Sequence, residues 1–236
     1  MPRFDVVTFD CYGTLIDWET GIREAFLRAA ASDGVALPSA ELLAVYAQIE
    51  PAVEAETYRR YREVLALTAS RVATRLGWRI GPDRAGFLAE SLASWRPFAD
   101  TNPALRRLAA AGCRLGILSN VDDDLLDGTR RLLDAVFDPV VTAAQVRSYK
   151  PAPEHFLEAR RRLQEGSRWL HAAQSYFHDV VPCRKLGVPV AWINRTGGKA
   201  GGEGPPDWEF PDLAGLADWM AGDRVAAPGT FPPRLS

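Results

Sequence analysis

Phe4-Asp-Val-Val-Thr-Phe-Asp-Cys-Tyr-Gly-Thr-Leu15 is the stretch of this chain that decides its fold. Its branched apolar residues predict a short buried strand that ends at a single carboxylate, Asp10. Gly13 and Thr14 then turn the chain tightly and place backbone N–H groups and a hydroxyl beside that carboxylate. Open α/β sheets build their sites at the carboxyl ends of parallel strands. Asp10 is therefore a candidate nucleophile, because a carboxylate there can attack an electrophile and form a covalent intermediate.

Length and composition are typical of a globular enzyme. The 236 residues are 47% hydrophobic and 25% charged, with a formal net charge of -2. That length supports one large domain or a core with an inserted cap, and the charge gives no indication of nucleic-acid binding. The sequence shows no leader with a cleavage site and no apolar run of the ~20 residues needed to span a bilayer. We therefore expect a cytoplasmic enzyme without membrane contact.

The three cysteines, Cys11, Cys113 and Cys183, show no CxxC spacing. Each lies in or beside an apolar stretch, which predicts small buried hydrophobic side chains. Cys11 is expected on the opposite face of its strand from Asp10, because successive side chains of a strand alternate.

The pattern of elements changes near Pro97. Residues 18–93 read as helical, with a break at 77–82, and carry few strand signals. Beyond Pro97, helix and strand signals alternate, which predicts a doubly wound parallel sheet. The strands are expected at 113–118, 139–142, 170–177 and 188–194, and the helices at 103–111, 123–135, 153–164, 182–186 and 210–221. A glycine-rich loop at 197–204 and an irregular tail from Pro228 complete the prediction.

Further polar residues stand at or near the ends of these strands. Ser119 and Asn120 follow the strand that ends at Leu118, so their hydroxyl and amide are expected at the ligand-binding edge of the sheet. Lys150 precedes a proline that opens a helix, and a lysine beside Asp10 would keep the nucleophile ionised. His178 and Asp179 come after the strand at 170–177.

In order and spacing, these motifs resemble the haloacid dehalogenase superfamily. Asp10-Cys-Tyr-Gly-Thr-Leu15 is similar to its first motif, Ser119 to its second, Ser-Tyr-Lys150-Pro to its third, and His178-Asp179 matches the position of its fourth. Phosphatases of the superfamily carry a second Asp two residues after the nucleophile, where this chain has Tyr12. A tyrosine hydroxyl with a pKa of ~10 is a poor acid or base near neutral pH. Tyrosine at this position is typical of the 2-haloacid dehalogenase branch.

The resemblance implies a Rossmann-like core at 1–17 and 97–236 with a helical cap at 18–96. It also implies that Asp10 displaces a halide from C2 of a small carboxylic acid and forms an ester. Lys150 would balance charge, and Asp179 would hold the water that hydrolyses the ester. Ser119 would bind the substrate carboxylate, Asn120 would help to receive the halide, and the other expected substrate contacts are Tyr12, Thr14 and His178.

The resemblance implies a small-molecule substrate and neither a cofactor nor a metal. It is weakest in the cap, where dehalogenases carry an arginine that accepts the halide. The corresponding stretch, Glu41 to Tyr46, has none. Arg59, Arg60 and Arg62 lie later in the cap and would either reach the site or form a solvated face.

Three alternatives stay open at this point. The opening motif and the His178-Asp179 pair are also similar to L-azetidine-2-carboxylate hydrolase, which implies displacement at a C–N bond. A magnesium-dependent phosphatase would hold Mg²⁺ through Asp10 and Asp179, but Tyr12 and the single acid of the fourth motif count against it. The third is a non-catalytic binding protein on the same fold. Cap-to-cap dimers in this branch suggest a homodimer by analogy.

Overall fold

The structure, a computed structural model, describes residues 2–202 and 204–222 of the chain. Within this part, six parallel strands form one sheet in the order β3-β2-β1-β4-β5-β6. The strands are β1 (Val6–Phe9), β2 (Arg114–Ser119), β3 (Phe137–Thr142), β4 (Trp169–Ala173), β5 (Val190–Ile193) and β6 (Trp208–Phe210). The order runs outward in both directions from the β1–β4 pair, which confirms the predicted doubly wound sheet.

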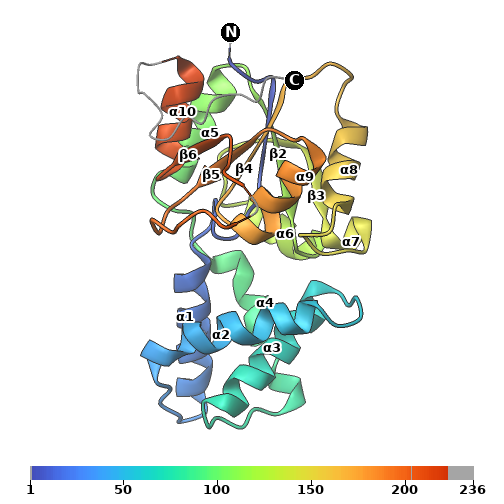
Figure 1. Ribbon diagram of the computed structural model, residues 1–236. Coiled ribbons are helices and arrows are strands. Elements are labelled where there is room, and N and C mark those ends of the chain that lie inside the picture. The colour runs from blue at the N-terminus through green and yellow to red at the C-terminus, as the bar shows by residue number, and fades with distance from the viewer. Residues whose placement is uncertain (1, 203, 223–236) are drawn as a thin grey trace.

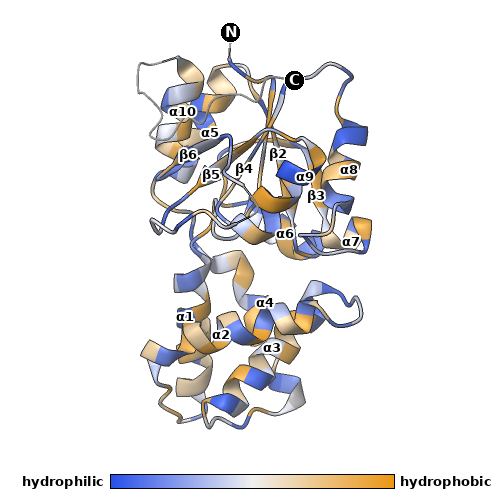
Figure 2. Ribbon diagram, viewed as in Figure 1, coloured by the Kyte–Doolittle hydropathy of each residue, from blue (hydrophilic) through white to orange (hydrophobic). Residues whose placement is uncertain are grey.

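The helices fall into two groups (Figure 1). One group lies beyond one end of the sheet and consists of α1 (Trp18–Ser32), α2 (Ser39–Glu54), α3 (Tyr61–Arg75), η1 (Pro82–Arg84), α4 (Phe87–Ser91) and η2 (Leu92–Ser94). The other group lies around the sheet and consists of α5 (Thr101–Ala110), α6 (Asp123–Arg130), α7 (Ala143–Val146), α8 (Glu154–Arg162), the π-helical turn η3 (Tyr176–Val180), α9 (Val181–Leu186) and α10 (Leu213–Ala221). In Figure 2 the helices carry both orange and blue stretches, as expected where one face packs and the other is exposed.

Side chains of β1 alternate between two hydrophobic clusters. Val6 packs in the cluster that contains Phe156 of α8 and Cys183 of α9, whereas Val7 and Phe9 pack in the larger cluster. Cys11 also belongs to the larger cluster, as the alternation predicts. All three cysteines are free and buried, in agreement with the sequence-based expectation.

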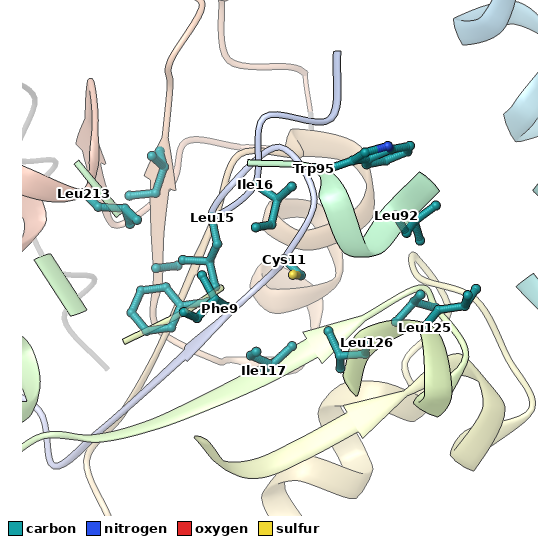
Figure 3. Close-up of a cluster of buried hydrophobic side chains, with 14 of the residues drawn as sticks. Phe9, Cys11, Leu15, Ile16, Leu92, Trp95, Ile117, Leu125, Leu126 and Leu213 are labelled. Atoms are coloured by element: carbon teal, nitrogen blue, oxygen red, sulfur yellow. The ribbon is translucent and has the colours of Figure 1, made fainter. Parts of the chain in front are cut away.

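One hydrophobic cluster joins the sheet to the separate helical group. Figure 3 shows Phe9, Leu15 and Ile16 gathered with Leu92 and Trp95 from the end of that group. The chain also enters and leaves the helical group at neighbouring points, because Ile16 bridges to Pro97 and the Asp17 N–H donates to the Arg96 carbonyl over 2.9 Å. The helical group is therefore attached along its base as well as through the chain.

Two predicted elements extend beyond the observed ones, and one observed strand was not predicted. The strand expected at 170–177 ends at Ala173, and the apolar run continues into η3, where the Ser175 Oγ accepts the His178 N–H over 3.2 Å. The helix expected at 123–135 ends at Arg130. Strand β6 was not predicted, because three residues are too short to show a period. The tail from Pro228 lies outside the described residues.

Candidate active site

Asp10 lies directly after β1, beside the point where the strand order reverses. Its side chain is largely buried, and each carboxylate oxygen has a partner. Lys150 Nζ donates to Oδ1 over 2.9 Å, and the Thr14 hydroxyl donates to Oδ2 over 2.9 Å. Burial raises the pKa of Asp10, while the ammonium of Lys150 opposes that rise. The nucleophile expected from the sequence therefore sits in a fixed orientation beside a cation.

Lys150 is 2% exposed and uses its ammonium on three acceptors. These are Asp10 Oδ1, Asp179 Oδ1 at 2.7 Å and the Leu118 carbonyl at 2.9 Å. Burial by itself lowers the pKa of Lys150, but attraction to the two carboxylates is stronger in sum and raises it. The lysine therefore stays charged and links the two acids that the sequence singled out.

Asp179 is fully buried and ends a chain of hydrogen bonds through the sheet. Trp169 Nε1 donates to the Thr8 hydroxyl over 2.8 Å, Thr8 lies 2.9 Å from His171 Nδ1, and His171 Nε2 lies 3.0 Å from Asp179 Oδ1. Burial alone raises the pKa of Asp179, but Lys150 and His171 outweigh it and lower that pKa. Asp179 Oδ2 has no partner among the described residues.

Sequence reasoning missed the three side chains behind Asp179. Thr8 and His171 occupy paired positions of the buried strands β1 and β4, and Trp169 stands two residues before His171. The available signal was a histidine inside an otherwise apolar strand, because a buried polar group needs partners.

Ser119 and Asn120 follow β2 and play different parts. The Ser119 hydroxyl is buried and has no partner in the described structure, so it remains free to bind a ligand. Its carbonyl is contacted by Nε2 of His155 at 3.2 Å, and burial lowers the pKa of this histidine to about 3. Asn120 uses both ends of its amide on the backbone of Lys150, at 2.7 and 3.1 Å. Asn120 lines the cavity described below, but its polar atoms hold the lysine in place.

The other expected substrate contacts are also engaged by the protein. The hydroxyl of Tyr12 lies 2.8 Å from that of Thr129. Thr14 donates to Asp10 and accepts the Gln174 N–H over 2.9 Å, and it is not among the described residues that line the cavity, so its hydroxyl supports the nucleophile here. His178 Nδ1 lies 3.0 Å from the Ser175 hydroxyl, and burial lowers the pKa of His178.

A cavity of about 250 Å³ opens between the sheet edge and the separate helices. Asp10, Ser119, Lys150 and Asp179 line it from the sheet side. The helical group contributes a ring of aromatic and acidic side chains that includes Trp18, Tyr46, Glu50, Glu54, Tyr61 and Trp95. These residues cover the nucleophile, so a small molecule bound there would be largely screened from bulk water.

Arg59, Arg60 and Arg62 do not line this cavity. Arg60 and Arg62 pair with Asp124 at the start of α6, and Arg59 pairs with Glu56 over 3.0 Å. All three therefore form ion pairs at the surface, which favours the solvated face of the two alternatives that the sequence left open.

The carboxylate of Asp122 connects the two helical groups. It is fully buried and precedes α6, yet it accepts the N–H groups of Tyr61 and Arg62, both over 3.0 Å. These are the first two residues of α3, so Asp122 caps a helix that belongs to the other group. Tyr149 adds a second link by donating its hydroxyl to the Arg59 carbonyl over 2.9 Å.

The two acids that a Mg²⁺ site would use are already engaged by a cation. Asp10 and Asp179 both direct Oδ1 at the ammonium of Lys150, while Asp179 Oδ2 has no partner among the described residues. No group of three or more His, Cys, Asp or Glu residues in the described part of the chain is arranged to hold a metal.

Comparisons with known proteins agree with this geometry. The profile of the haloacid dehalogenase-like hydrolases matches residues 4–171, and the chain belongs to this family. The (S)-2-haloacid dehalogenase 4A of Burkholderia cepacia is 27% identical over 210 residues, which cover 87% of each chain. An (S)-2-haloacid dehalogenase of Pseudomonas putida is 26% identical over 235 residues, which cover 93% of this chain and 98% of that one.

A solved structure shares the fold. The L-2-haloacid dehalogenase from Xanthobacter autotrophicus with chloropropionic acid covalently bound has a TM-score of 0.78 at 22% identity, covering 93% of this chain and 99% of that chain. This protein is therefore a hydrolase of the haloacid dehalogenase-like family on a doubly wound fold. None of the helices within the described ranges is long and apolar enough to cross a membrane.

Proposed function

We propose that this hydrolase displaces the substituent at C2 of a small carboxylic acid, with Asp10 as nucleophile and a halide as leaving group. The observation that carries the proposal is the Asp10–Lys150–Asp179 triad at the edge of a cavity of about 250 Å³. The relatives named above are dehalogenases of 2-haloacids, which supports the leaving group.

In the first step, an Asp10 oxygen forms a bond to C2 while the bond from C2 to the halogen breaks. The electron pair of the broken bond leaves with the halide, and the substrate becomes an ester of Asp10. Lys150 keeps Asp10 ionised before attack, and Thr14 fixes the plane of the carboxylate. The free hydroxyl of Ser119 donates to the substrate carboxylate.

In the second step, water attacks the carbonyl carbon of the Asp10 ester. Asp179 lines the cavity, and its Oδ2, which has no partner within the described residues, accepts a hydrogen bond from that water. The low pKa of Asp179 keeps this oxygen charged, so Asp179 orients the water. The bond between that carbon and the ester oxygen then breaks, and the departing oxygen takes a proton from the attacking water. Asp10 is restored, and a 2-hydroxy acid is released.

We also propose the division of labour that the sequence suggested. Residues 1–17 and 97–236 would form the core that carries the nucleophile, the lysine and the second acid. Residues 18–96 would form the cap, whose helices supply the outer wall of the cavity.

Displacement at a C–N bond is the second candidate. Its support is that no arginine is among the described residues that line the cavity, where an arginine is expected to receive a halide. A neutral amine would leave without that requirement.

The test is a single-turnover reaction in H₂¹⁸O without added metal and with a chelator present. L-2-Chloropropionate and L-azetidine-2-carboxylate are the substrates, and para-nitrophenyl phosphate, with and without Mg²⁺, is the comparison. If Asp10 is the nucleophile, the first product carries ¹⁶O at C2, and ¹⁸O appears in the peptide that contains Asp10. Halide or ring-opened amine identifies the leaving group.

Asp10→Asn is the control and should lower the rate by at least ~10⁴-fold, as expected when an acting nucleophile is removed. Label found only in the product would show direct attack by water and would overturn the proposed mechanism. Phosphate release that requires Mg²⁺, with no reaction at C2, would favour the phosphatase alternative. Binding without turnover of any of these compounds would favour the non-catalytic alternative.

A further inference from the structure

Two glutamates of the cap face the same cavity as the nucleophile. Glu50 and Glu54 lie one helical turn apart on α2, and both line the cavity opposite Asp10 and Lys150. Both are partly buried. Tyr61 donates its hydroxyl to Glu50 Oε1 over 3.1 Å. Neither glutamate forms an ion pair with a lysine or arginine within the described ranges.

The cavity is therefore rich in carboxyl groups. Asp10, Asp179, Glu50 and Glu54 line it, and among the described residues that line it the only lysine or arginine is Lys150. That lysine already shares its charge between Asp10 and Asp179. A substrate with a single negative charge would enter against unbalanced acids, whereas a substrate that also carries a positive group would neutralise them.

Burial governs the state of the two glutamates. It raises the pKa of Glu50 to about 7, against the hydrogen bond from Tyr61. Burial, together with repulsion from Glu50, raises the pKa of Glu54 to about 9, against the attraction of Lys150. Near neutral pH the pair consequently retains at least one proton. A bound cation would favour the charged form of both carboxyls, because an opposite charge lowers the pKa of an acid.

Two further atoms, in residues that line the cavity, indicate a ligand with a different polar group at each end. The hydroxyl of Ser119 and Asp179 Oδ2 are both buried, both belong to residues that line the cavity, and neither has a partner in the described structure. Ser119 offers a donor to a carboxylate on the sheet side. Glu50 and Glu54 offer acceptors on the cap side.

We infer that Glu50 and Glu54 form an ammonium-binding subsite, so that the substrate is a small zwitterion: a 2-substituted carboxylic acid that also carries a protonated amine. This inference rests on the proposed function, since it places the ammonium in the cavity where Asp10 attacks C2. The ammonium is either a separate group beside a C2 halide or the leaving nitrogen of a strained ring.

In the ring-opening reaction, the ring nitrogen is the leaving group. Asp10 forms its bond to C2, the C2–N bond breaks, and the nitrogen takes the electron pair. The nitrogen leaves as a neutral primary amine beside Glu50 and Glu54, and it takes the proton that hydrolysis of the Asp10 ester releases in the second step. The product is a 2-hydroxy acid with a protonated primary amine.

Binding of unreactive pairs tests the subsite without turnover. 3-Aminopropanoate, 4-aminobutanoate and 5-aminopentanoate are titrated calorimetrically against butanoate, pentanoate and hexanoate, each of which replaces the ammonium with a methyl group. For the best-fitting pair we expect the amino acid to bind at least ~10-fold more tightly, a difference of ~1.4 kcal/mol. Glu50→Gln and Glu54→Gln keep the side-chain shape and should each reduce that ratio by ~5-fold or more.

Glu41→Gln is the matched control, because Glu41 is an exposed residue of the same helix. It should leave the ratio unchanged. Equal binding of the two series, no measurable binding of the amino acids, or unchanged ratios in both Gln variants would overturn the subsite.

Turnover distinguishes this inference from the function on which it rests. L-2-Chloropropionate, 2-chloro-4-aminobutanoate and L-azetidine-2-carboxylate are compared in the wild type and in Asp10→Asn. Preference for the two amines supports the subsite, and the released group shows which nitrogen it holds. Binding of the amino acids with no turnover of any compound would retain the subsite and reject the proposed function. Turnover of chloropropionate with no binding of the amino acids would retain the proposed function and reject the subsite.

Discussion

Thr8 holds the second acid of the site through a histidine. Its hydroxyl accepts from Trp169 and contacts His171, which contacts Asp179. Thr8→Val keeps the shape but leaves two buried polar groups without a partner. We expect a loss of about 1–3 kcal/mol in the free energy of unfolding. We also expect a lower kcat, because His171 no longer presents a fixed N–H to Asp179. Urea unfolding and steady-state kinetics measure the two effects.

Thr68→Val is the matched control for this change. Thr68 is also fully buried, but its hydroxyl has no partner in the described structure. Removing that hydroxyl should leave stability unchanged or raise it slightly, since no hydrogen bond is lost. Equal losses in the two variants would show that the Thr8 chain contributes nothing beyond the burial of a methyl group.

At the scale of elements, Asp122 joins the cap to the core by capping α3. Asp122→Ala removes both acceptors, and the loss of such a cap typically costs ~1 kcal/mol. We expect faster hydrogen exchange at the amides of Tyr61 and Arg62 and a KM raised several-fold, because Tyr61 lines the cavity. Asp124→Ala removes only exposed ion pairs to Arg60 and Arg62, which are worth at most ~1 kcal/mol. Unchanged exchange in Asp122→Ala would contradict the capping role.

Sequence reasoning predicts the strand ends of this site but not the contacts between the two helical groups. Strand ends are local features, so the sequence alone places Asp10 and Ser119 at one edge of the sheet, and both line the cavity there. Asp179 lines it too, but from the turn η3 and not from directly after a strand. Contacts across the cap–core boundary are not local. Asp122 resembles an ordinary helix N-cap in sequence, and only the tertiary structure shows that its carboxylate serves α3.

The cap glutamates illustrate a second limit. Glu50 and Glu54 have the spacing of a solvated helix face, and only the packing of α2 over the sheet edge makes them part of a cavity. The boundary between β4 and η3 was predicted wrongly because of a local pattern. The tyrosine and phenylalanine of η3 extend the apolar pattern of β4 beyond the end of the strand.

At the scale of the whole molecule, one hydrophobic cluster contains side chains of both the sheet and the helical group that we propose as the cap (Figure 3). We expect both parts to unfold in a single transition, with urea curves from circular dichroism and tryptophan fluorescence coinciding. The joint depends on Gly21 of α1, because a Cβ there would lie 2.4 Å from Cγ of Trp95. Gly21→Ala therefore forces the indole away from the cluster.

Such overpacking typically costs about 1–3 kcal/mol, and here it falls on the junction. We expect Gly21→Ala to unfold at lower urea, to separate the two curves as the cap detaches first, and to lower kcat/KM because Trp95 lines the cavity. Gly86→Ala is the control in the same cap, since its added Cβ would meet only a flexible Glu90 oxygen at 3.4 Å. Coincident curves in Gly21→Ala would mean that the cluster tolerates the displaced indole. Separate curves in the wild type would mean that the cap folds independently of the sheet.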